Sequence, residues 1–241
     1  MKEALRLAMA ISGGGTTMQA IGEASRQGEL KGLVEPVVVI ASRAGIVGIA
    51  KAQELNIPVE VVLRKDFPKG AEGIEPFGNA VLTVLQKYQP DVVTLNGFLC
   101  QISGEVIEAF PKRIFNQHPG PVPDFGGVGM YGRRVHAAVL IFTRLAKRPH
   151  PYTEMITQRV AQKYDLGEVV GSASVEITDF DTVDSLQQRA LPIEHRVQIG
   201  LLKDIVLGRV REMPRETYVQ PGERVLLYIA QEAGKALYPQ G

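Results

Sequence analysis

Short apolar runs alternate with helix-spaced stretches over about the first 120 residues, and this alternation constrains the fold most strongly. Each run is short enough for a strand that is buried on both faces. Such strands, separated by helices, are typical of a parallel, doubly wound sheet. The sequence therefore predicts an α/β fold. The expected strands are Leu5–Ile11, Val34–Ile40, Val59–Leu63, Val92–Leu95 and Ile114–Phe115, and the expected helices are Met18–Arg26, Gly48–Leu55, Phe77–Tyr88 and Gly104–Phe110, the last with Ser103 as its N-cap.

The second half of the chain changes character. After a helical stretch from Arg134 to Leu145, two segments alternate between apolar and polar residues, Glu154–Ala161 and Glu168–Ile177. Alternation with a period of two predicts half-exposed antiparallel strands that extend the parallel sheet. A long helical pattern follows over Asp181–Leu207. Pro192 lies inside it, which predicts a kink or break near Leu191 because proline removes a backbone donor.

No linker, repeat or low-complexity tract divides the chain. We therefore expect one domain over residues 1–207. Residues 208–241 are expected to form a C-terminal extension that packs on this domain or trails from it, with a mobile tail after about Pro214.

Charge and cysteine content limit the partners and the compartment. The chain has 27 basic and 26 acidic residues, so it lacks the positive field that would favour a nucleic-acid partner. No segment approaches the roughly 18 apolar residues that a membrane span needs. The single cysteine, Cys100, cannot form an internal disulfide, which suits a reducing cytoplasm. As a lone cysteine after an expected strand, it fits a small buried residue better than a nucleophile.

Asn116-Gln117-His118-Pro119 stands where an apolar strand meets a loop rich in glycine and proline. Reacting groups gather at the carboxyl ends of strands in open α/β sheets. Residues two apart in an extended segment point the same way, so Asn116 and His118 can face one substrate atom. The amide could donate to a developing oxyanion and the imidazole could serve as acid or base. The alternatives are a loop-bonding amide and a core histidine.

A glycine-rich loop, Gly13-Gly14-Gly15-Thr16-Thr17, joins the first expected strand to the first expected helix. Glycines allow a close backbone approach, and free N–H groups at a helix start attract anions, so a phosphate monoester is a fitting ligand. The loop lacks the lysine of a P-loop and the third glycine of the dinucleotide fingerprint. The alternative is a tight turn in which Thr16 or Thr17 caps the helix.

Asp165, in a Tyr-Asp-Leu-Gly turn between the two alternating segments, is the carboxylate that could partner His118 if the strand ends meet. It could equally be an ordinary turn residue. Four scattered histidines and one cysteine show no metal-ligand spacing, so no metal is implied.

Several of these motifs in the same order resemble the folate-dependent formyltransferases, from Leu5 to about Val206. The phosphate-loop motif is similar to residues 11–21, the Asn-x-His-Pro motif matches residues 116–119, and the Asp-x-Gly turn matches residues 165–167. The departures include Gln158, where a histidine is usual. The resemblance implies a Rossmann-like formyltransferase fold, with a parallel sheet extended by antiparallel strands and helices on both faces.

The resemblance also implies a function. A formyl group would pass from 10-formyltetrahydrofolate, as co-substrate and without a metal, to the amine of glycinamide ribonucleotide in purine biosynthesis. The amine would attack the formyl carbon directly and form a tetrahedral intermediate. The side-chain amide of Asn116 and a protonated His118 would stabilise the oxyanion of this intermediate, and Asp165 would complete the catalytic trio. The loop from Gly13 to Thr17 would bind the substrate phosphate, Glu194 would bind the glycinamide part, and the folate would contact Leu99, Cys100, Gln101, Ile102, Ala161 and Tyr164.

Three alternatives stay open: a formyltetrahydrofolate deformylase, a formyltransferase for another amine such as an amino sugar nucleotide, and a non-catalytic nucleotide- or folate-binding protein. A deformylase of this family usually carries an extra N-terminal domain, for which a first strand at Leu5 leaves no room. The expected partners are small-molecule substrates, not nucleic acid or membranes, and the resemblance allows a homodimer.

Overall fold

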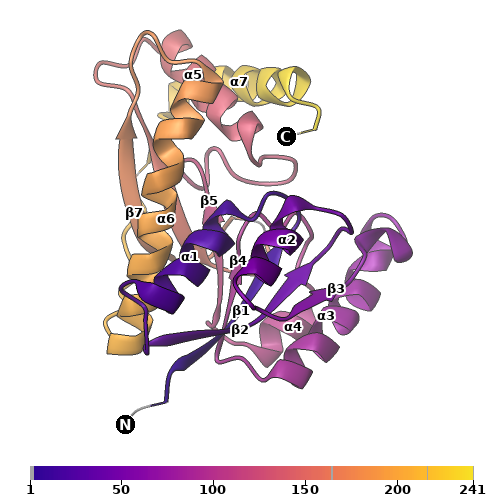
Figure 1. Cartoon of the computed structure of the whole chain (residues 1–241). Coiled ribbons are helices and arrows are strands. Elements are labelled where there is room, and N and C mark those ends of the chain that lie inside the picture. Colours follow the sequence, from indigo (N-terminus) through magenta and orange to yellow (C-terminus); the bar gives the residue numbers. More distant parts are fainter. Residues whose placement is uncertain (1–2, 164, 216, 241) are drawn as a thin grey trace. The chain divides into compact units, whose positions relative to one another are not determined.

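The computed structural model describes residues 3–163, 165–215 and 217–240, and within them seven strands form one sheet in the order β3-β2-β1-β4-β5-β6-β7 (Figure 1). The α/β fold expected from the sequence is confirmed: β1 to β5 are parallel, and β6 and β7 pair in the antiparallel sense. In the described part of the chain, no helix is both long and apolar enough to cross a lipid bilayer.

The contacts divide the chain into two compact units. Unit 1 comprises residues 1–116, 159–162 and 198–210, and unit 2 comprises residues 117–158, 163–197 and 211–241. The single domain expected over residues 1–207 stays a prediction.

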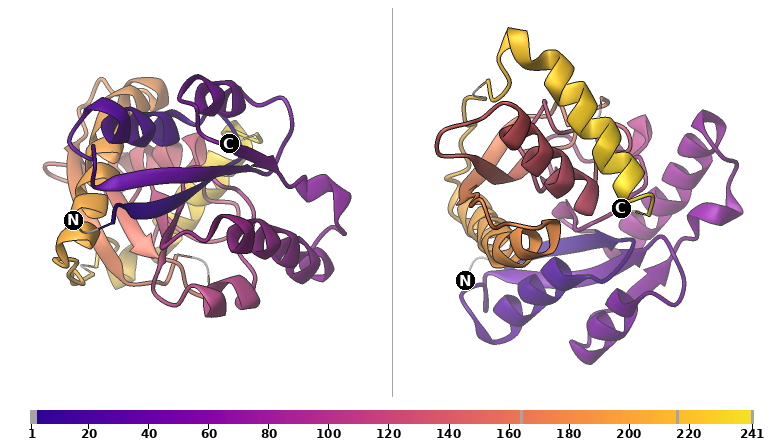
Figure 2. Two further views of the ribbon diagram at one scale, coloured as in Figure 1. Left: turned by 60° about the horizontal axis from the view of Figure 1, so that its bottom comes forward. Right: turned by 90° about the horizontal axis from the view of Figure 1, so that it is seen from above.

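Unit 1 holds the parallel strands and the helices that connect them. Its strands are β1 (Leu5–Ile11), β2 (Val34–Ala41), β3 (Val59–Val61), β4 (Val92–Leu95) and most of β5 (Ile114–His118). Its helices are α1 (Thr16–Gln27), α2 (Val47–Glu54), α3 (Ile74–Tyr88) and α4 (Gly104–Ala109), with two short 3₁₀ turns, Arg64–Asp66 and Ala71–Gly73. Figure 2 shows α1 and α2 on one face of these strands and α3 and α4 on the other.

Alternate strand residues face the two helical layers. Ala8 and Ala10 of β1 share a buried cluster with Phe77 of α3 and Val106 of α4. Because successive strand side chains point to opposite faces, Met9 lies on the other side, where it is fully buried. Burial on both faces explains the continuous apolar runs in the sequence.

Unit 2 contains β6 (Tyr152–Arg159), β7 (Val169–Glu176), α5 (Arg133–Leu145) and most of α6 (Val183–Leu207). It also contains α7 (Arg224–Leu237), preceded by a 3₁₀ turn at Pro221–Glu223. The mobile tail expected after Pro214 is therefore wrong, because α7 buries Leu227 and Ala230 in the same core as Phe142 of α5. α7 is ordered because its apolar face is buried, even though the helix lies near the C-terminus.

Three local expectations can be set against the structure. α6 runs through Pro192 as one helix, so the expected break is absent, and the alternative, a kink, stays a prediction. α1 has Gly15 as its N-cap, so neither Thr16 nor Thr17 caps it. Ser103 is the N-cap residue of α4, as expected, although its side chain makes no capping bond to the helix.

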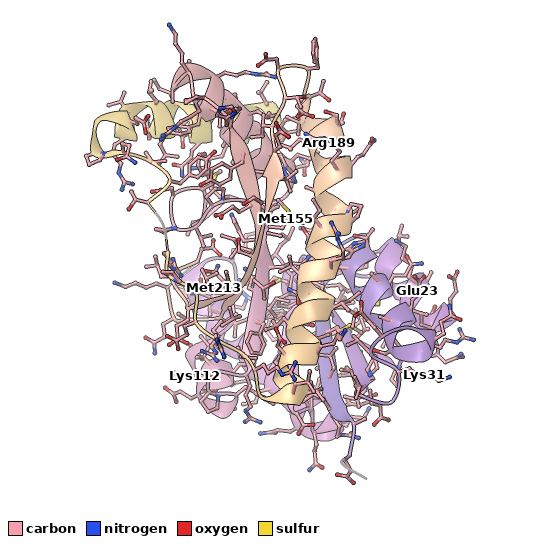
Figure 3. All side chains as sticks on the ribbon, turned by 90° about the vertical axis from the view of Figure 1, so that its left-hand side faces the viewer. Glu23, Lys31, Lys112, Met155, Arg189 and Met213 are labelled. Atoms are coloured by element: carbon pink, nitrogen blue, oxygen red, sulfur yellow. The ribbon has the colours of Figure 1, made fainter. Side chains whose placement is uncertain are left out.

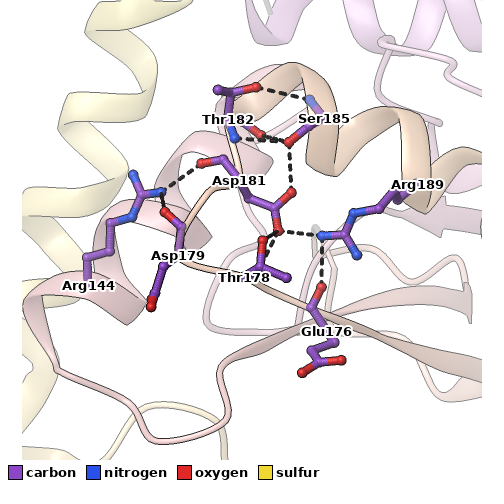
Figure 4. A network of polar contacts seen from close by, with 8 residues as sticks. All are labelled: Arg144, Glu176, Thr178, Asp179, Asp181, Thr182, Ser185 and Arg189. Carbon is purple, nitrogen blue, oxygen red and sulfur yellow. Dashed lines mark hydrogen bonds and ion pairs between the residues drawn. The ribbon is translucent and has the colours of Figure 1, made fainter.

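The start of α6 is held by a polar network around Asp181 (Figure 4). One Asp181 carboxylate oxygen accepts bonds from the Thr178 N–H at 2.8 Å and from Arg189. The other accepts from the Ser185 hydroxyl at 2.7 Å. Burial raises the pKa of Asp181, but these hydrogen bonds outweigh it, and the pKa lies below its ordinary value.

Replacing Asp181 by alanine is expected to lower the free energy of unfolding at pH 7 by about 2 kcal/mol, because buried donors lose their acceptor. Since the folded pKa is depressed, this stabilisation is present above pH 3.8 and disappears as the pH falls further. Urea unfolding of the variant and the wild type at pH 7 and pH 3 measures both effects. The matched control is Asp179→Ala, whose side chain is exposed; equal losses in the two variants would contradict the role given to the network.

Candidate functional site

His118 and Asp165 lie together in unit 2. Asp165 Oδ2 is 3.9 Å from His118 Nδ1, and their side chains are only 7% and 4% exposed. The other ring nitrogen, Nε2, is 2.9 Å from the carbonyl oxygen of Phe125. The two residues are 47 positions apart in the sequence, so their meeting comes from the fold. The expected proximity of this carboxylate and this imidazole is therefore observed, whereas their catalytic role stays a prediction.

The Asp165 carboxylate is fixed by several neighbours. Its Oδ2 accepts the Gly127 N–H at 2.8 Å, and its Oδ1 accepts the Gln158 amide at 2.6 Å. Gly126 permits this approach, because a Cβ there would lie 2.6 Å from the Asp165 Cβ. Asp165 itself has a φ of 52°, a left-handed conformation that Asp adopts more readily than most residues. The surrounding chain thus determines the position of the carboxylate.

Arg215 reaches the same turn from the C-terminal extension. Its guanidinium donates to the Asp165 carbonyl at 3.0 Å, to the Gln158 side-chain oxygen at 3.3 Å and to the Gly167 carbonyl. Burial lowers the pKa of Arg215, and the charge of Asp165 opposes that effect. No sequence motif marks Arg215, and its hydrogen bonds join residues far apart in the chain. In the sequence, Gln158 stands out only because a histidine is usual at that position of the family.

His136 of α5 is a second imidazole in unit 2. It is 3% exposed, and its buried Nδ1 has no hydrogen-bond partner among the residues that the structure describes. Burial, and secondarily repulsion from His118, lowers the pKa of His136 to about 4. It is therefore neutral at pH 7, and it had no signal in the sequence.

Asn116 and Glu194 occupy different surroundings. Asn116 pairs with Leu95 in the β4–β5 ladder and is half-buried. Glu194 of α6 is also half-buried and accepts a hydrogen bond from the Gln117 amide at 2.5 Å. In unit 2 the residue before His118 therefore binds the carboxylate that we expected to contact substrate.

The glycine-rich loop of unit 1 leads directly into the first turn of α1. Gly15, its last glycine, has a φ of 61°, and a Cβ there would lie 2.9 Å from the Gly48 Cα. Glycine is therefore required at this position. A Cβ on Gly13 or Gly14 would meet no atom within 4 Å. The loop thus presents open backbone at a helix N-terminus, where N–H groups favour an anion.

The expected folate segment follows β4 and lies beside this loop. The Leu99 N–H donates to Ser12 Oγ at 2.9 Å, and the Ser12 N–H donates to the Gly97 carbonyl at 3.1 Å. Leu99 is 41% exposed, whereas Cys100 and Ile102 pack partly against the α3–α4 core. Burial raises the pKa of the Cys100 thiol, which keeps it protonated and argues against a nucleophile.

The remaining folate candidates are less defined. Gln101 and Ala161 are half-buried residues of unit 1, outside helices and strands. Tyr164 lies outside the described residues. Among the residues that the structure does describe, no group of three or more His, Cys, Asp or Glu side chains is placed to hold a metal ion.

Fold and site define a class: a Rossmann-like α/β protein with a glycine-rich first loop at a helix N-terminus and a histidine–carboxylate pair after a parallel strand. Residues 5–202 match the formyl transferase family. The chain belongs to this family, as the motifs had indicated.

Named relatives agree with this assignment. A chloroplastic phosphoribosylglycinamide formyltransferase of Arabidopsis thaliana is 33% identical over 86% of this chain and 67% of its own length. A phosphoribosylglycinamide formyltransferase of Haemophilus influenzae is 27% identical over 86% of this chain and 89% of its own length. The crystal structure of glycinamide ribonucleotide transformylase 1 from Symbiobacterium toebii superimposes with a TM-score of 0.74, at 28% identity, covering 89% of this chain and 93% of that one.

Proposed function

We propose that this chain transfers a formyl group from 10-formyltetrahydrofolate to the amine of glycinamide ribonucleotide. The carrying observation is the close pairing of His118 with Asp165 in a chain that belongs to the formyl transferase family. The substrate is inferred from two relatives, both of which are named phosphoribosylglycinamide formyltransferases. This reaction belongs to purine biosynthesis.

The proposed chemistry is direct transfer. The substrate amine attacks the formyl carbon, its nitrogen forms the new C–N bond, and the carbonyl oxygen becomes an oxyanion. The bond to the folate nitrogen then breaks, and the proton lost by the amine is delivered to that nitrogen. Asn116 donates to the oxyanion, and a preorganised donor of this kind typically contributes about 3 kcal/mol.

His118 has its Nδ1 turned toward Asp165, at a distance longer than a direct hydrogen bond. A separation of 3.9 Å leaves both groups within reach of one bridging water. We assign the Nδ1 side of the His118 ring to stabilising the oxyanion, because the other ring nitrogen, Nε2, is already bonded to the Phe125 carbonyl. Asp165 pairs with the ring and relays the amine proton through that water.

The remaining substrate contacts are assigned by chemistry. The loop from Gly13 to Thr17 binds the ribonucleotide phosphate through backbone N–H groups and hydroxyls. Glu194 binds the glycinamide end as a carboxylate that faces an amine. Leu99, Cys100, Gln101, Ile102, Ala161 and Tyr164 are proposed to bind the folate.

The deciding experiment compares folate deformylation with and without an acceptor. Purified chain is mixed with 10-formyltetrahydrofolate, and loss of the formyl group is followed by absorbance. The proposal expects turnover only when glycinamide ribonucleotide is added. Turnover that ignores the acceptor would identify a deformylase, and turnover with an amino sugar nucleotide alone would identify another transferase.

The non-catalytic alternative makes a separate prediction. A binding protein would keep its ligand affinity after His118→Ala and would show no activity to lose. A cytoplasmic location and a homodimer stay predictions; the Arabidopsis relative is described as chloroplastic.

A further inference from the structure

The C-terminal extension contributes a side chain to the surroundings of Asp165. Residues 203–241 lie beyond the family match, which ends at residue 202. Arg215 nevertheless donates to the backbone carbonyls of Asp165 and Gly167 and to the Gln158 side-chain oxygen. A planar guanidinium donates to several acceptors in a fixed, fork-like geometry, whereas the three donors of a lysine ammonium rotate about a single point.

The Gln158 amide links Arg215 to the carboxylate. Arg215 bonds the amide oxygen, which directs the amide nitrogen toward Asp165 Oδ1 at 2.6 Å. Arg215 thus holds Asp165 twice: directly at its carbonyl and indirectly at its carboxylate. Because Asp165 has a left-handed backbone, its turn needs outside bonds to keep this conformation.

The segment that carries Arg215 is itself anchored within unit 2. The Met213 N–H donates to the Val169 carbonyl at the start of β7 at 2.8 Å; Met213 is labelled in Figure 3. On the other side of Arg215, the Val219 N–H donates to Asp124 Oδ2 at 3.0 Å. Tyr218 packs edge-on against Phe125, whose carbonyl faces His118. The backbone on both sides of Arg215 is therefore held in place within unit 2.

We propose that Arg215 is a positioning residue for the reaction, which sets the Asp165 carboxylate against His118 through Gln158 and the turn backbone. This inference rests on the proposed function. The acceptors and their geometry, rather than the positive charge alone, give Arg215 this role. The extension is then part of the catalytic machinery although it lies outside the family's matched region.

The test measures kcat and KM for formyl transfer by Arg215→Met, Arg215→Lys and two control variants. Arg211→Met removes an exposed arginine of the same segment. Arg148→Met removes an arginine that donates to the Tyr218 carbonyl and to Glu223, so it loosens the extension without touching the Asp165 turn. Melting temperatures of all variants report the purely structural cost.

Arg215→Met is expected to lower kcat by roughly 10- to 100-fold, as misplacement of a reacting group by about 1 Å does, with KM close to wild type. Arg215→Lys should fall between wild type and Arg215→Met. Arg211→Met should keep kcat, and Arg148→Met should lose much less kcat than Arg215→Met, because it loosens the segment but leaves the Arg215 side chain in place. Wild-type kcat in Arg215→Met would overturn the inference, as would an equal loss of kcat in Arg148→Met or a loss confined to KM. Should Arg215→Met fail to fold, Arg215→Lys decides by the same criterion.

A readout without turnover separates this inference from the proposed function. The ¹⁵N NMR shifts of the His118 ring report its surroundings directly. If wild type does not formylate glycinamide ribonucleotide, yet these shifts move in Arg215→Met and not in Arg211→Met, the proposed function fails and the positioning role stands. Unmoved shifts in both variants would overturn the positioning role itself.

Discussion

His118→Ala is expected to lower kcat by about 1000-fold, within the range usual for loss of a donor that stabilises the oxyanion. The ring is 4% exposed and faces the Asp165 carboxylate, so water cannot readily replace it. KM for glycinamide ribonucleotide should change little, because the proposed phosphate contacts belong to the loop from Gly13 to Thr17. Steady-state kinetics with both substrates measures the two parameters separately.

The matched control is His150→Asn, which removes an exposed histidine and keeps a residue tolerant of its positive φ of 53°. That variant should keep wild-type kcat. A His118→Ala protein that folds and turns over within tenfold of wild type would contradict the catalytic role of the imidazole.

The free energy of unfolding is expected to fall by about 2 kcal/mol between pH 7 and pH 5 because of His136 alone. Its folded pKa is about 4 against 6.5 in the unfolded chain. Since the folded pKa is lowered, the stabilisation is complete above pH 6.5 and is lost as the pH falls toward 4. The full difference of 2.5 pKa units (6.5 minus 4) corresponds to about 3 kcal/mol.

His136→Leu should remove this pH dependence, since leucine fills a similar volume and carries no proton. It should cost little at pH 7, because in the described part of the chain His136 Nδ1 has no hydrogen-bond partner to lose. Urea unfolding of both proteins at several pH values tests this, with His150→Asn as a control that keeps the wild-type slope. An unchanged slope in His136→Leu would show that His136 does not titrate as its burial predicts.

The parallel half of the fold follows from local pattern alone. The expected strand Leu5–Ile11 is β1 to the residue, because burial on both faces leaves an uninterrupted apolar run. β5 extends three residues beyond the expected Ile114–Phe115, through His118. The last residues of β5 are polar, so a prediction based on apolar runs ends the strand before it reaches the candidate site.

The C-terminal half depends on contacts that no local pattern contains. α6 tolerates Pro192, and α7 is ordered by burying Leu227 and Ala230 rather than by its own propensity. Arg215 bonds residues 48 to 57 positions away. A single arginine in a proline-bounded segment carries no periodicity or spacing, so only the folded chain reveals what it contacts.

In the candidate site too, some features could be predicted from motifs and others could not. His118 and Asp165 could be named from motifs, and their meeting is confirmed at 3.9 Å. The roles of Asn116, Glu194 and the folate residues stay predictions. Neither the Gln117–Glu194 bond nor the Gly126 approach to Asp165 could be foreseen, because each joins segments that are far apart in the sequence.

The most direct test of the central claim is identification of the product. Purified chain, 10-formyltetrahydrofolate and glycinamide ribonucleotide are incubated together, and the ribonucleotide is analysed by mass spectrometry while tetrahydrofolate is quantified in parallel. The account predicts one N-formylated glycinamide ribonucleotide for each tetrahydrofolate released. Release of tetrahydrofolate with free formate and an unmodified ribonucleotide would contradict it.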